Sequence, residues 1–457
     1  MRRINPKGRA EHERAVDALR ASYAAVPPGE TVRLAKKTSN LFRPRSTTGP
    51  AGLDVSGLDG VVAVDPVART ADVQGMCTYE DLVDATLPHG LMPLVVPQLR
   101  TITLGGAVTG LGIESTSWKH GLPHESVIEL DILTGAGDVV TVRPEGEHAD
   151  LYAAFPNSLG SLGYATRLRI ELQPVADRVS LRNLRFDDVD ELLEVVGEVM
   201  KTGEHDGTPV DVMDGVVFRP GESYLVLGTF GGDGPTSDYT GQDVYYRSLR
   251  SKATDRLTAY DYLWRWDTDW FWCSAAFGVQ HPAVRRLWPK RYRRSDVYHR
   301  IVRFENRHGV AARVDRWRGL PARERVVQDV EVPLDRTGAF LRWFAQHVPM
   351  APLWLCPLRL RERAWPLYPM HAGTPYVNVG FWGTVPIEPG AADGDVNRAI
   401  EEQVFELGGH KSLYSDAYYD RGTFDELYGG AAYRAVKERY DPGHRLTDLY
   451  DKVVGRR

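Results

Sequence analysis

Four glycines lie close together in one short segment of the chain. Gly105, Gly106, Gly110 and Gly112 fall within residues 101–115, between small and β-branched side chains. Glycines at this density let a backbone approach a ligand and present N–H groups to a phosphate or a ring edge. The spacing matches neither the G-x-G-x-x-G fingerprint nor a P-loop, so it predicts a binding loop of another kind. A tight structural loop is the alternative interpretation.

Two further segments of the ligand-binding type flank this loop in the sequence. In residues 157–164, Gly160 and Gly163 precede a segment that alternates like a half-buried strand. In residues 37–43, Ser and Asn side chains are of the kind that can bond a pyrophosphate. Three such loops within the first 175 residues favour a cofactor site over three unrelated turns.

The elements around these loops indicate an α+β fold. A helix is expected at 10–25, a hairpin at 61–75, a helix at 78–90, a second hairpin at 127–144 and a strand at 164–175. After Pro174 the chain changes to longer strands, amphipathic helices and most of the tryptophans. We therefore expect an N-terminal helix, a cofactor domain, a substrate domain and a C-terminal segment, at residues 1–30, 31–175, 176–405 and 406–457.

Composition narrows the class of protein. The net charge of −5 gives no reason to expect nucleic acid as a partner. Cys77, Cys273 and Cys356 are widely spaced, and the 13 histidines show no metal-ligand spacing, so neither disulfides nor a metal is predicted. The sequence has no secretory h-region and no apolar run of about 18 residues, which predicts a cytoplasmic protein.

Several motifs in order resemble the FAD-binding domain of the vanillyl-alcohol-oxidase superfamily: the Gly-rich segment, the second hairpin, and residues 149–155 and 157–164. The resemblance implies a two-subdomain PCMH-type domain rather than a Rossmann fold, with a C-terminal segment that folds back to the flavin. The loop that often tethers flavin in that family corresponds to residues 37–43, which hold neither His nor Cys, so dissociable FAD is expected. Cys77 is better explained as a small core side chain.

The resemblance also implies which residues line the FAD. They are Thr38, Ser39, Asn40, Thr103, Leu104, Gly105, Gly106, Thr109, Gly110, Gly112, Ile113, Glu114, Ser115, Ser117, Trp118, Gly121, Asn157, Ser158, Gly160, Ser161 and Gly163. Lys411 is expected either at a flavin or nicotinamide phosphate or, equally, at the surface.

Residues 112–122, 326–333, 352–357, 376–383 and 413–418 resemble the 24-dehydrocholesterol reductase (Diminuto) family. This chain departs from that family at Trp118, where the family tends to have His, and it has no membrane helix. It is also similar to actinobacterial flavoproteins that reduce a 10-methylene fatty acyl chain after a methyltransferase has acted. The resemblance implies an FAD-dependent alkene reductase of a phospholipid acyl chain, with NADPH as a transient donor.

Reduction of an isolated alkene requires a proton and a hydride. Protonation of the methylene carbon would give a tertiary cation for N5 of reduced flavin to quench, which requires a general acid in a dry pocket. Tyr414, Asp416 and Glu114 are the candidate acids. The alternatives are a hydrogen-bonded core Tyr, a cap or salt-bridge Asp, and a Glu that clamps the flavin loop.

Two stretches of the substrate domain suit a lipid. Residues 260–278 carry Trp264, Trp266, Trp270, Phe271 and Trp272, which suit either an apolar channel or ordinary core packing. The stretch that follows combines basic and interfacial aromatic side chains and predicts peripheral contact with an anionic membrane, unless it is only a solvated face. Its members are Arg285, Arg286, Trp288, Lys290, Arg291, Tyr292, Arg293 and Arg294.

Three other functions stay open from the sequence. The first is an oxidase of a lipid-linked sugar or alcohol, and the second is a Δ24-sterol-type reductase. The third is a non-enzymatic lipid- or flavin-binding partner of a methyltransferase. NADPH consumption favours a reductase, whereas flavin bleaching by an alcohol alone favours an oxidase.

Overall fold

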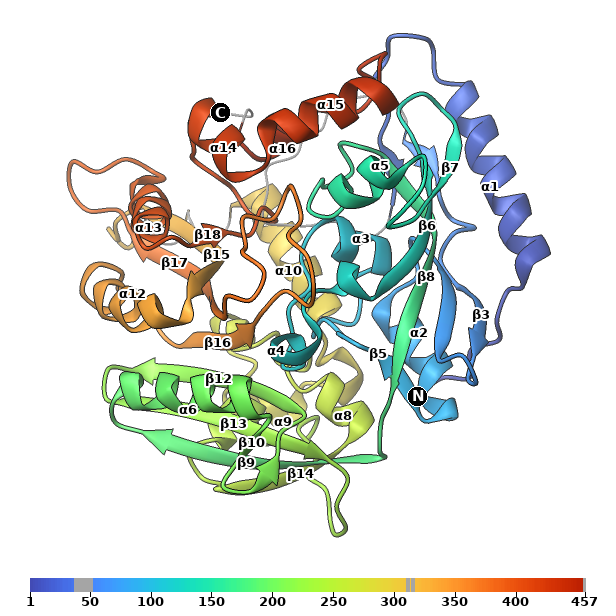
Figure 1. The fold of residues 1–457 in the computed structure, drawn as a ribbon. Helices are drawn as coiled ribbons and strands as arrows, with labels where there is room; N and C mark the ends of the chain where they lie inside the picture. Colours follow the sequence, from blue (N-terminus) through green and yellow to red (C-terminus); the bar gives the residue numbers. More distant parts are fainter. Residues whose placement is uncertain (37–51, 310–312, 314–316, 455–457) are drawn as a thin grey trace.

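The computed structural model describes residues 1–36, 52–309, 313 and 317–454 (Figure 1). Two antiparallel sheets organise this part of the chain, and each belongs to a different half of the sequence. The smaller sheet has the strand order β3-β4-β8-β6-β7, with β5 paired to β8. Its strands are β3 (Val61–Asp65), β4 (Thr70–Gln74), β5 (Leu91–Pro93), β6 (Val127–Leu133), β7 (Val139–Val142) and β8 (Tyr164–Pro174).

Helices and a short parallel pair complete the N-terminal half. They are α1 (Arg9–Ala24), α2 (Tyr79–Thr86), α3 (Leu104–Thr109), α4 (Ser117–His120), α5 (Ala149–Ala154), β1 (Leu34–Ala35) and β2 (Leu53–Asp54). The predicted hairpins at 61–75 and 127–144 are confirmed by the β3–β4 and β6–β7 pairings. Thr78 caps α2 by accepting a hydrogen bond from the Asp81 amide, as its position before the helix predicts.

The larger sheet has eight strands in the order β14-β9-β13-β12-β16-β17-β15-β18. These strands are β9 (Arg178–Phe186), β12 (Val212–Arg219), β13 (Glu222–Phe230), β14 (Thr254–Thr258), β15 (Arg323–Pro333), β16 (Leu353–Leu358), β17 (Tyr376–Pro386) and β18 (His410–Lys411). The short pair β10 (Glu204–His205) and β11 (Thr208–Pro209) lies outside it. Apart from β12–β13 and β16–β17, strands that lie side by side are not consecutive in the chain, so the sheet gathers residues from 178 to 411.

The two faces of the larger sheet differ in chemistry because side chains alternate along each strand. One face contributes Leu225, Leu355, Val330, Val379 and Phe381 to an apolar core. That core is covered by the helices α6 (Val189–Thr202), α12 (Leu334–His347) and α13 (Asp395–Glu406), as the layers of Figure 1 show. The opposite face, which we call the polar sheet face, carries Asp214, Trp354, Asn378, Trp382, Asp329 and Glu331.

The remaining helices belong to a lobe and to the C-terminal segment. The lobe contains α7 (Tyr245–Ser248), α8 (Ala259–Leu263), α9 (Pro282–Leu287) and α10 (Ser295–His308). The C-terminal helices α14 (Arg421–Leu427), α15 (Gly430–Tyr440) and α16 (Leu449–Val453) lie beside α5 and the first sheet (Figure 1). Arg439 pairs with Asp150, and Tyr440 contacts His148, so this segment packs on the N-terminal half.

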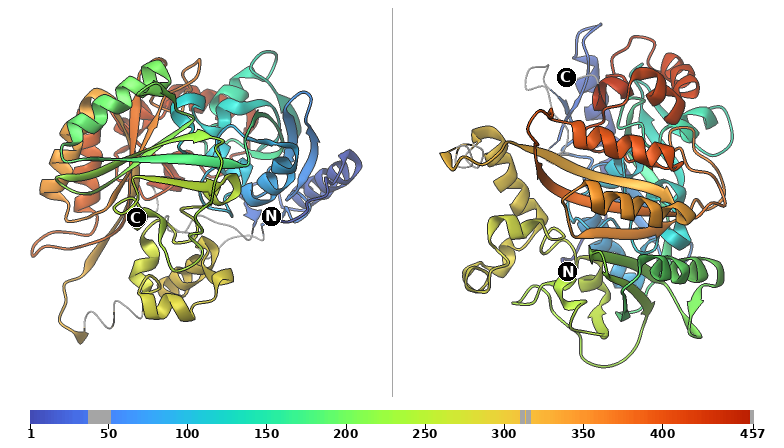
Figure 2. Two further views of the ribbon diagram at one scale, coloured as in Figure 1. Left: turned by 90° about the horizontal axis from the view of Figure 1, so that it is seen from below. Right: turned by 90° about the vertical axis from the view of Figure 1, so that its left-hand side faces the viewer.

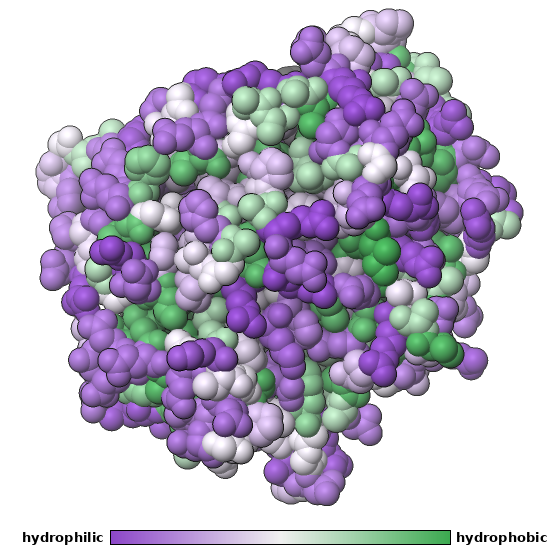
Figure 3. All heavy atoms as spheres, in the orientation of Figure 1, coloured by the Kyte–Doolittle hydropathy of each residue, from purple (hydrophilic) through white to green (hydrophobic). Residues whose placement is uncertain are grey.

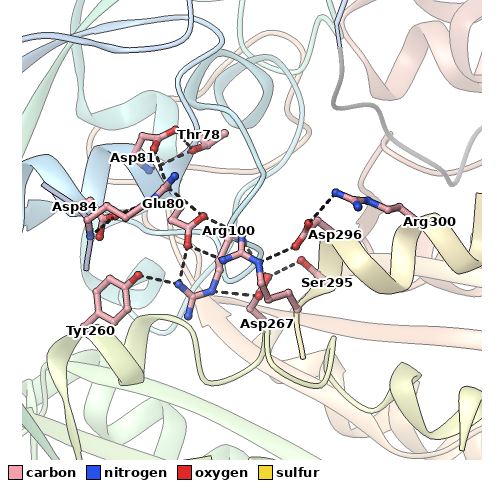
Figure 4. Close-up of polar contacts among 12 residues, drawn as sticks. Thr78, Glu80, Asp81, Asp84, Arg100, Tyr260, Asp267, Ser295, Asp296 and Arg300 are labelled. Atoms are coloured by element: carbon pink, nitrogen blue, oxygen red, sulfur yellow. Dashed lines mark hydrogen bonds and ion pairs between the residues drawn. The ribbon is translucent and has the colours of Figure 1, made fainter. Parts of the chain in front are cut away.

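An ion-pair network joins the N-terminal half to the lobe (Figure 4). Glu80 of α2 bonds Arg100 at 3.0 Å and Arg294, just before α10, at 2.8 Å. Arg100 also pairs with the buried Asp267 at 3.3 Å and bonds the Tyr260 hydroxyl of α8. The network therefore ties α2, the segment that leads to α3, the first half of the aromatic stretch and the start of α10 to one another.

Candidate active site

The Gly-rich segment is a short helix rather than an open loop. Residues 104–109 form α3, and the Thr103 hydroxyl caps it by accepting from the Gly106 amide at 3.2 Å. A Cβ on Gly105 would lie 2.6 Å from the Gly75 carbonyl oxygen, and one on Gly112 would lie 2.6 Å from Pro123. These two glycines therefore permit close packing within the protein, as the structural alternative for the Gly-rich segment predicts.

The second predicted loop lies directly against the first. The Leu159 amide donates to the Thr109 carbonyl at 2.7 Å, and Asn157 donates to the Leu367 carbonyl at 2.7 Å. Gly163 has a φ of 140°, a conformation that L side chains rarely adopt. The structure thus brings residues 103–118 and 157–163 together, while Thr38, Ser39 and Asn40 lie outside the described residues.

A buried amide six residues before α3 fits a polar cofactor. Gln98 is 3% exposed, and neither atom of its amide group has a hydrogen-bond partner within the described ranges. A buried donor and acceptor without partners is costly, and a flavin ring edge or a pyrophosphate would supply both. On the outer side of α3, Gly106 and Thr109 keep accessible surface one turn apart. The chemistry of these residues would suit a polar cofactor such as FAD.

Glu114 belongs to a fully buried cluster of opposite charges. The Arg265 guanidinium donates to Glu114 Oε1 at 2.8 Å and to Asp214 Oδ2 at 2.9 Å. Asp214 also accepts from the indole N–H groups of Trp266 and Trp354, each at 3.1 Å. Burial raises the pKa of Glu114, and the neighbouring guanidinium opposes that rise.

This cluster fastens the segment 112–118 to the larger sheet. Glu114 also accepts from the Ser115 hydroxyl at 2.6 Å, and the Met213 amide of β12 donates to the Ser115 carbonyl at 2.7 Å. The contacts of Glu114 match those of a clamp for the loop. Its role as a proton donor stays a prediction.

A second buried cluster lies further along the polar sheet face. Asp329 of β15 accepts a hydrogen bond from Asn378 of β17 at 2.8 Å. Burial raises the pKa of Asp329 to about 6, although hydrogen bonds from Asn378 and Tyr414 favour its ionised form. Tyr414 in turn accepts from the Trp382 indole at 2.9 Å. A carboxyl group that exchanges protons near neutral pH is therefore bonded to a tyrosine hydroxyl.

Two more titratable groups adjoin Asp329. Glu331, two residues along β15, accepts from the Ser412 hydroxyl at 2.6 Å and lies 3.2 Å from His410 Nε2. Burial raises the pKa of Glu331 well above its ordinary value and lowers the pKa of His410 to about 3. Both groups are therefore favoured in their neutral forms, and the pair can hold a proton without carrying charge.

Aromatic rings connect the two clusters. Phe271 lies with its ring centroid 4.4 Å from Trp382 and 5.5 Å from Trp354. Trp266 stacks on Phe271 at 4.9 Å, and Trp272 lies 5.4 Å from Trp382. The aromatic stretch of the sequence thus forms a layer over the polar sheet face, as part of the main core. Indole and phenyl faces are the groups that stabilise a nearby cation.

Three other predicted site residues lie elsewhere. Lys411 is buried on the helix-covered side of the sheet, where its ammonium pairs with Glu401 of α13 at 2.9 Å. This placement speaks against contact with a flavin or nicotinamide phosphate. Asp416 pairs with Arg325 at 2.9 Å, as the salt-bridge alternative would have it. Trp118 is buried in the helix-covered core.

The other predicted cofactor residues accompany the two loops. Leu104 and Ile113 are buried, the Ser117 hydroxyl accepts from the Glu114 amide, and the Gly110 carbonyl accepts from Tyr368. Ser158, Gly160 and Ser161 form the turn that precedes β8, and Gly121 ends α4.

Sequence reasoning missed Asp329, Glu331, Asp214 and Arg265. A signal was present, because Asp329 and Glu331 alternate within the apolar segment 326–333, and Asp214 interrupts a similar run. Charged residues in a buried strand are rare unless they are paired or functional. The order of the strands in the larger sheet, which the sequence does not reveal, brings these residues together.

Comparison with known proteins finds a matching family and several relatives. Residues 10–143 match the family described as "FAD binding domain". The chain is similar to human Delta(24)-sterol reductase, with 25% identity over 416 residues that cover 88% of this chain and 75% of the relative. The Arabidopsis thaliana Delta(24)-sterol reductase is 23% identical over 457 residues, 89% of this chain and 77% of that protein. Rice cytokinin dehydrogenase 6 is 39% identical over 122 residues, 27% of this chain.

The first third of the chain is thus similar to FAD-binding domains. The similarity to the sterol reductases extends through the larger sheet as well, since it covers nearly nine-tenths of the residues. None of the helices in the described part of the chain is long and apolar enough to cross a membrane.

Proposed function

We propose that the protein is an FAD-dependent reductase that saturates an isolated carbon–carbon double bond in a lipid. The coarse function is supported by the FAD-binding domain and by the similarity to sterol reductases. The observation that carries the chemistry is the buried Asp329–Tyr414 pair beneath a layer of aromatic rings. Bound FAD would supply the hydride, from N5 of its reduced form.

The chain's own residues would supply the proton and exclude water. Asp329 holds a proton at pH values below about 6 and is bonded to Tyr414, so the tyrosine hydroxyl can donate to an alkene carbon and be reprotonated by Asp329. Trp382 fixes the tyrosine by donating to its oxygen. The rings of Phe271 and Trp354 would favour the cationic carbon that protonation creates.

The preferred substrate is a phospholipid-bound acyl chain with a 10-methylene group, which becomes a 10-methyl branch. This choice follows from the resemblance to actinobacterial methylene reductases, and it places a methyltransferase before this enzyme. NADPH is the proposed transient electron donor, FAD is proposed to be dissociable, and the proposed location is cytoplasmic. A Δ24-sterol-type alkene is the second candidate, which the similarity to the sterol reductases favours.

A labelled single turnover tests the proposal. The purified flavoprotein is reduced anaerobically with NADPH in D2O buffer and mixed with vesicles of 10-methylene phospholipid, with desmosterol vesicles or with the saturated 10-methyl lipid as the control. We expect flavin reoxidation with the methylene lipid, and mass spectrometry should show one solvent deuterium in the new methyl branch. Reoxidation by desmosterol alone would select the sterol candidate.

Two outcomes would contradict an alkene reductase. In the first, NADPH leaves the flavin oxidised, whereas a lipid-linked sugar or alcohol reduces it. This result would point to the oxidase alternative. Bound FAD that neither NADPH nor an alcohol reduces would point to a non-enzymatic binding partner. Deuterium at carbon 10 rather than in the methyl branch would refute the proposed addition of the proton to the methylene carbon and of the hydride to carbon 10.

A further inference from the structure

Residues 281–308 form the outer part of the lobe and project from the body of the protein (Figure 2). Both views in Figure 2 show α9 and α10 (yellow) standing out from the two sheets. Buried ion pairs hold the base of this lobe: Arg285 bonds Asp269 at 2.6 Å, and Arg294 bonds Glu80 at 2.8 Å. Arg285, Arg293 and Arg294 are therefore not part of an exposed basic face, which corrects the grouping expected from the sequence.

Exposed apolar side chains concentrate on and next to this lobe. The described chain has ten large exposed apolar residues, of which Val284, Leu287, Tyr292, Phe304, Trp317 and Leu320 fall between residues 284 and 320. Leu287 is 84% exposed and Phe304 is 59% exposed. By contrast, apolar side chains are dispersed among polar ones on the face in Figure 3. A concentration of exposed apolar residues marks an interaction surface.

Arginines surround these apolar residues. Arg300, Arg303 and Arg307 are exposed at helical spacing on the same face of α10 as Phe304. On and after α9, the exposed basic residues are Arg286, Lys290 and Arg291. Of these six basic residues, only Lys290 and Arg300 form ion pairs within the described ranges, with Asp238 and Asp296. We call the six basic residues, together with Val284, Leu287, Tyr292 and Phe304, the lobe surface.

The opposite side of α10 packs on the aromatic layer. The Tyr298 ring stacks on Phe277 with centroids 6.1 Å apart, and the His299 ring meets Trp270 at 4.7 Å. Trp270 belongs to the same core as Trp354. One side of α10 therefore carries Arg300, Arg303 and Arg307, and its other side contacts Trp270 and Phe277 of the aromatic stretch.

We propose that the lobe surface docks on an anionic lipid bilayer. Arginines attract acidic headgroups, while Leu287, Tyr292 and Phe304 enter the interface between headgroups and acyl chains. A second copy of the chain is a poor occupant, because a symmetric contact would set the six cations of one copy against those of the other. This inference goes beyond the proposed reaction and rests on surface composition alone.

Vesicle flotation with the full FAD-loaded protein tests the docking without any turnover. We expect binding to vesicles of equal parts phosphatidylglycerol and phosphatidylcholine, weak binding to pure phosphatidylcholine, and release by salt. Arg300, Arg303 and Arg307 are replaced together by Gln. Each lost arginine should lower the partition coefficient about fivefold, the change that corresponds to about 1 kcal/mol, and the triple variant on the order of 100-fold.

A matched control removes the same charge elsewhere. Arg9, Arg14 and Arg20 are exposed on α1. Their joint replacement by Gln should leave vesicle binding within about twofold of the parent, because α1 does not contribute to the lobe surface that contacts the bilayer. A separate Leu287→Ser/Phe304→Ser variant should also weaken binding. FAD absorbance and thermal unfolding verify that each variant is folded.

Three outcomes would overturn the proposal. The parent protein could fail to float with anionic vesicles, or the α1 variant could lose as much binding as the α10 variant. The third is self-association in analytical ultracentrifugation that Phe304→Ser abolishes, which would assign the surface to a second copy. Because the readout is binding, failure here leaves the proposed reduction unaffected, and the converse also holds.

Discussion

Asp329 offers the sharpest residue-scale prediction. Its pKa of about 6 and its bond to Tyr414 mean that the donor form is lost as pH rises through this value. Flavin reoxidation by the alkene in a single turnover should therefore slow above about pH 6. Asp329→Asn should remove this pH dependence and lower the rate by about 100-fold or more, the range for loss of a general acid.

Two further variants make the assignment specific. Tyr414→Phe should lower the rate to a similar extent, since it removes the hydroxyl that Asp329 serves. Asp416→Asn breaks the ion pair with Arg325 and should keep the pH dependence. If Asp416→Asn abolished the dependence and Asp329→Asn kept it, the proton would come from the other carboxylate.

Arg265 carries a second residue-scale prediction, about stability. Arg265→Met would leave the carboxylates of Glu114 and Asp214 buried without their cation, and loss of one partner of such a pair costs about 3–5 kcal/mol. Burial favours the protonated form of Glu114, so the loss in free energy of unfolding should be greater at pH 8 than at pH 5. Urea titration measures both values. Arg247→Met, at an exposed site, should cost less than about 1 kcal/mol.

At the scale of elements, α3 depends on its contact with the end of β4. In Gly105→Ala the new methyl group would meet the Gly75 carbonyl at 2.6 Å, so α3 must shift away. Overpacking of this kind costs about 1–3 kcal/mol, and we expect weaker FAD retention with it. Chemical denaturation and flavin fluorescence measure the two effects.

Gly197 is the matched control because it lies within the helix α6. A Cβ there would meet only Leu334, at 3.4 Å. Gly197→Ala should therefore raise the free energy of unfolding by up to about 1 kcal/mol through helix propensity, without changing FAD retention. Equal effects of the two substitutions would show that the approach of α3 to Gly75 carries no special constraint.

At the scale of the whole molecule, the Glu80 network joins the N-terminal half to the lobe. Burial disfavours ionised Glu80, but three arginine guanidiniums outweigh it and lower its pKa to about 2 from 4.5. A depressed folded-state pKa contributes stability above pH 4.5 that is lost as pH falls toward 2. The shift corresponds to about 3 kcal/mol at most.

Glu80→Gln should flatten the acid limb of the stability curve between pH 4.5 and 2, and thermal unfolding across that range measures it. The change should also lower stability at pH 7, where the network is complete. Glu194→Gln, an exposed carboxylate on α6, should leave both properties unchanged. If the stability of Glu80→Gln depended on pH between 4.5 and 2 as the parent's does, the ionisation of Glu80 would not contribute to the stability of the network.

The local elements could be predicted from the sequence because their signals are local. Alternation of apolar and polar residues predicted the two hairpins, which the structure shows as β3–β4 and β6–β7. Thr78, a residue type that often caps helices, predicted the start of α2. The helix α3 could not be predicted, since its two glycines disfavour a helix. Its stability comes from the Thr103 cap and from packing on Gly75.

The candidate site was harder to predict because it depends on strand order. The two cofactor loops were expected, and the structure brings them together. The partners of Tyr414 and Glu114 come from β12, β15 and β17 and from the aromatic stretch, which are distant in sequence. No periodicity in one segment indicates which strand will lie beside it. The basic stretch could not be predicted for the same reason. Arg285 is buried against Asp269, so it does not belong to the exposed basic residues that the sequence grouped with it.

The C-terminal helices have a consequence for the order of synthesis. The 157–163 loop presents the carbonyls of Leu159 and Ser161 to the ammonium groups of Lys452 and Lys437, which follow 293 and 276 positions later. The 157–163 loop therefore emerges from the ribosome long before these two lysines have been synthesised. The loop can therefore reach its final set of contacts only after residues 437 and 452 have been synthesised, and a nascent chain stalled before residue 437 would present this loop without its two lysine anchors.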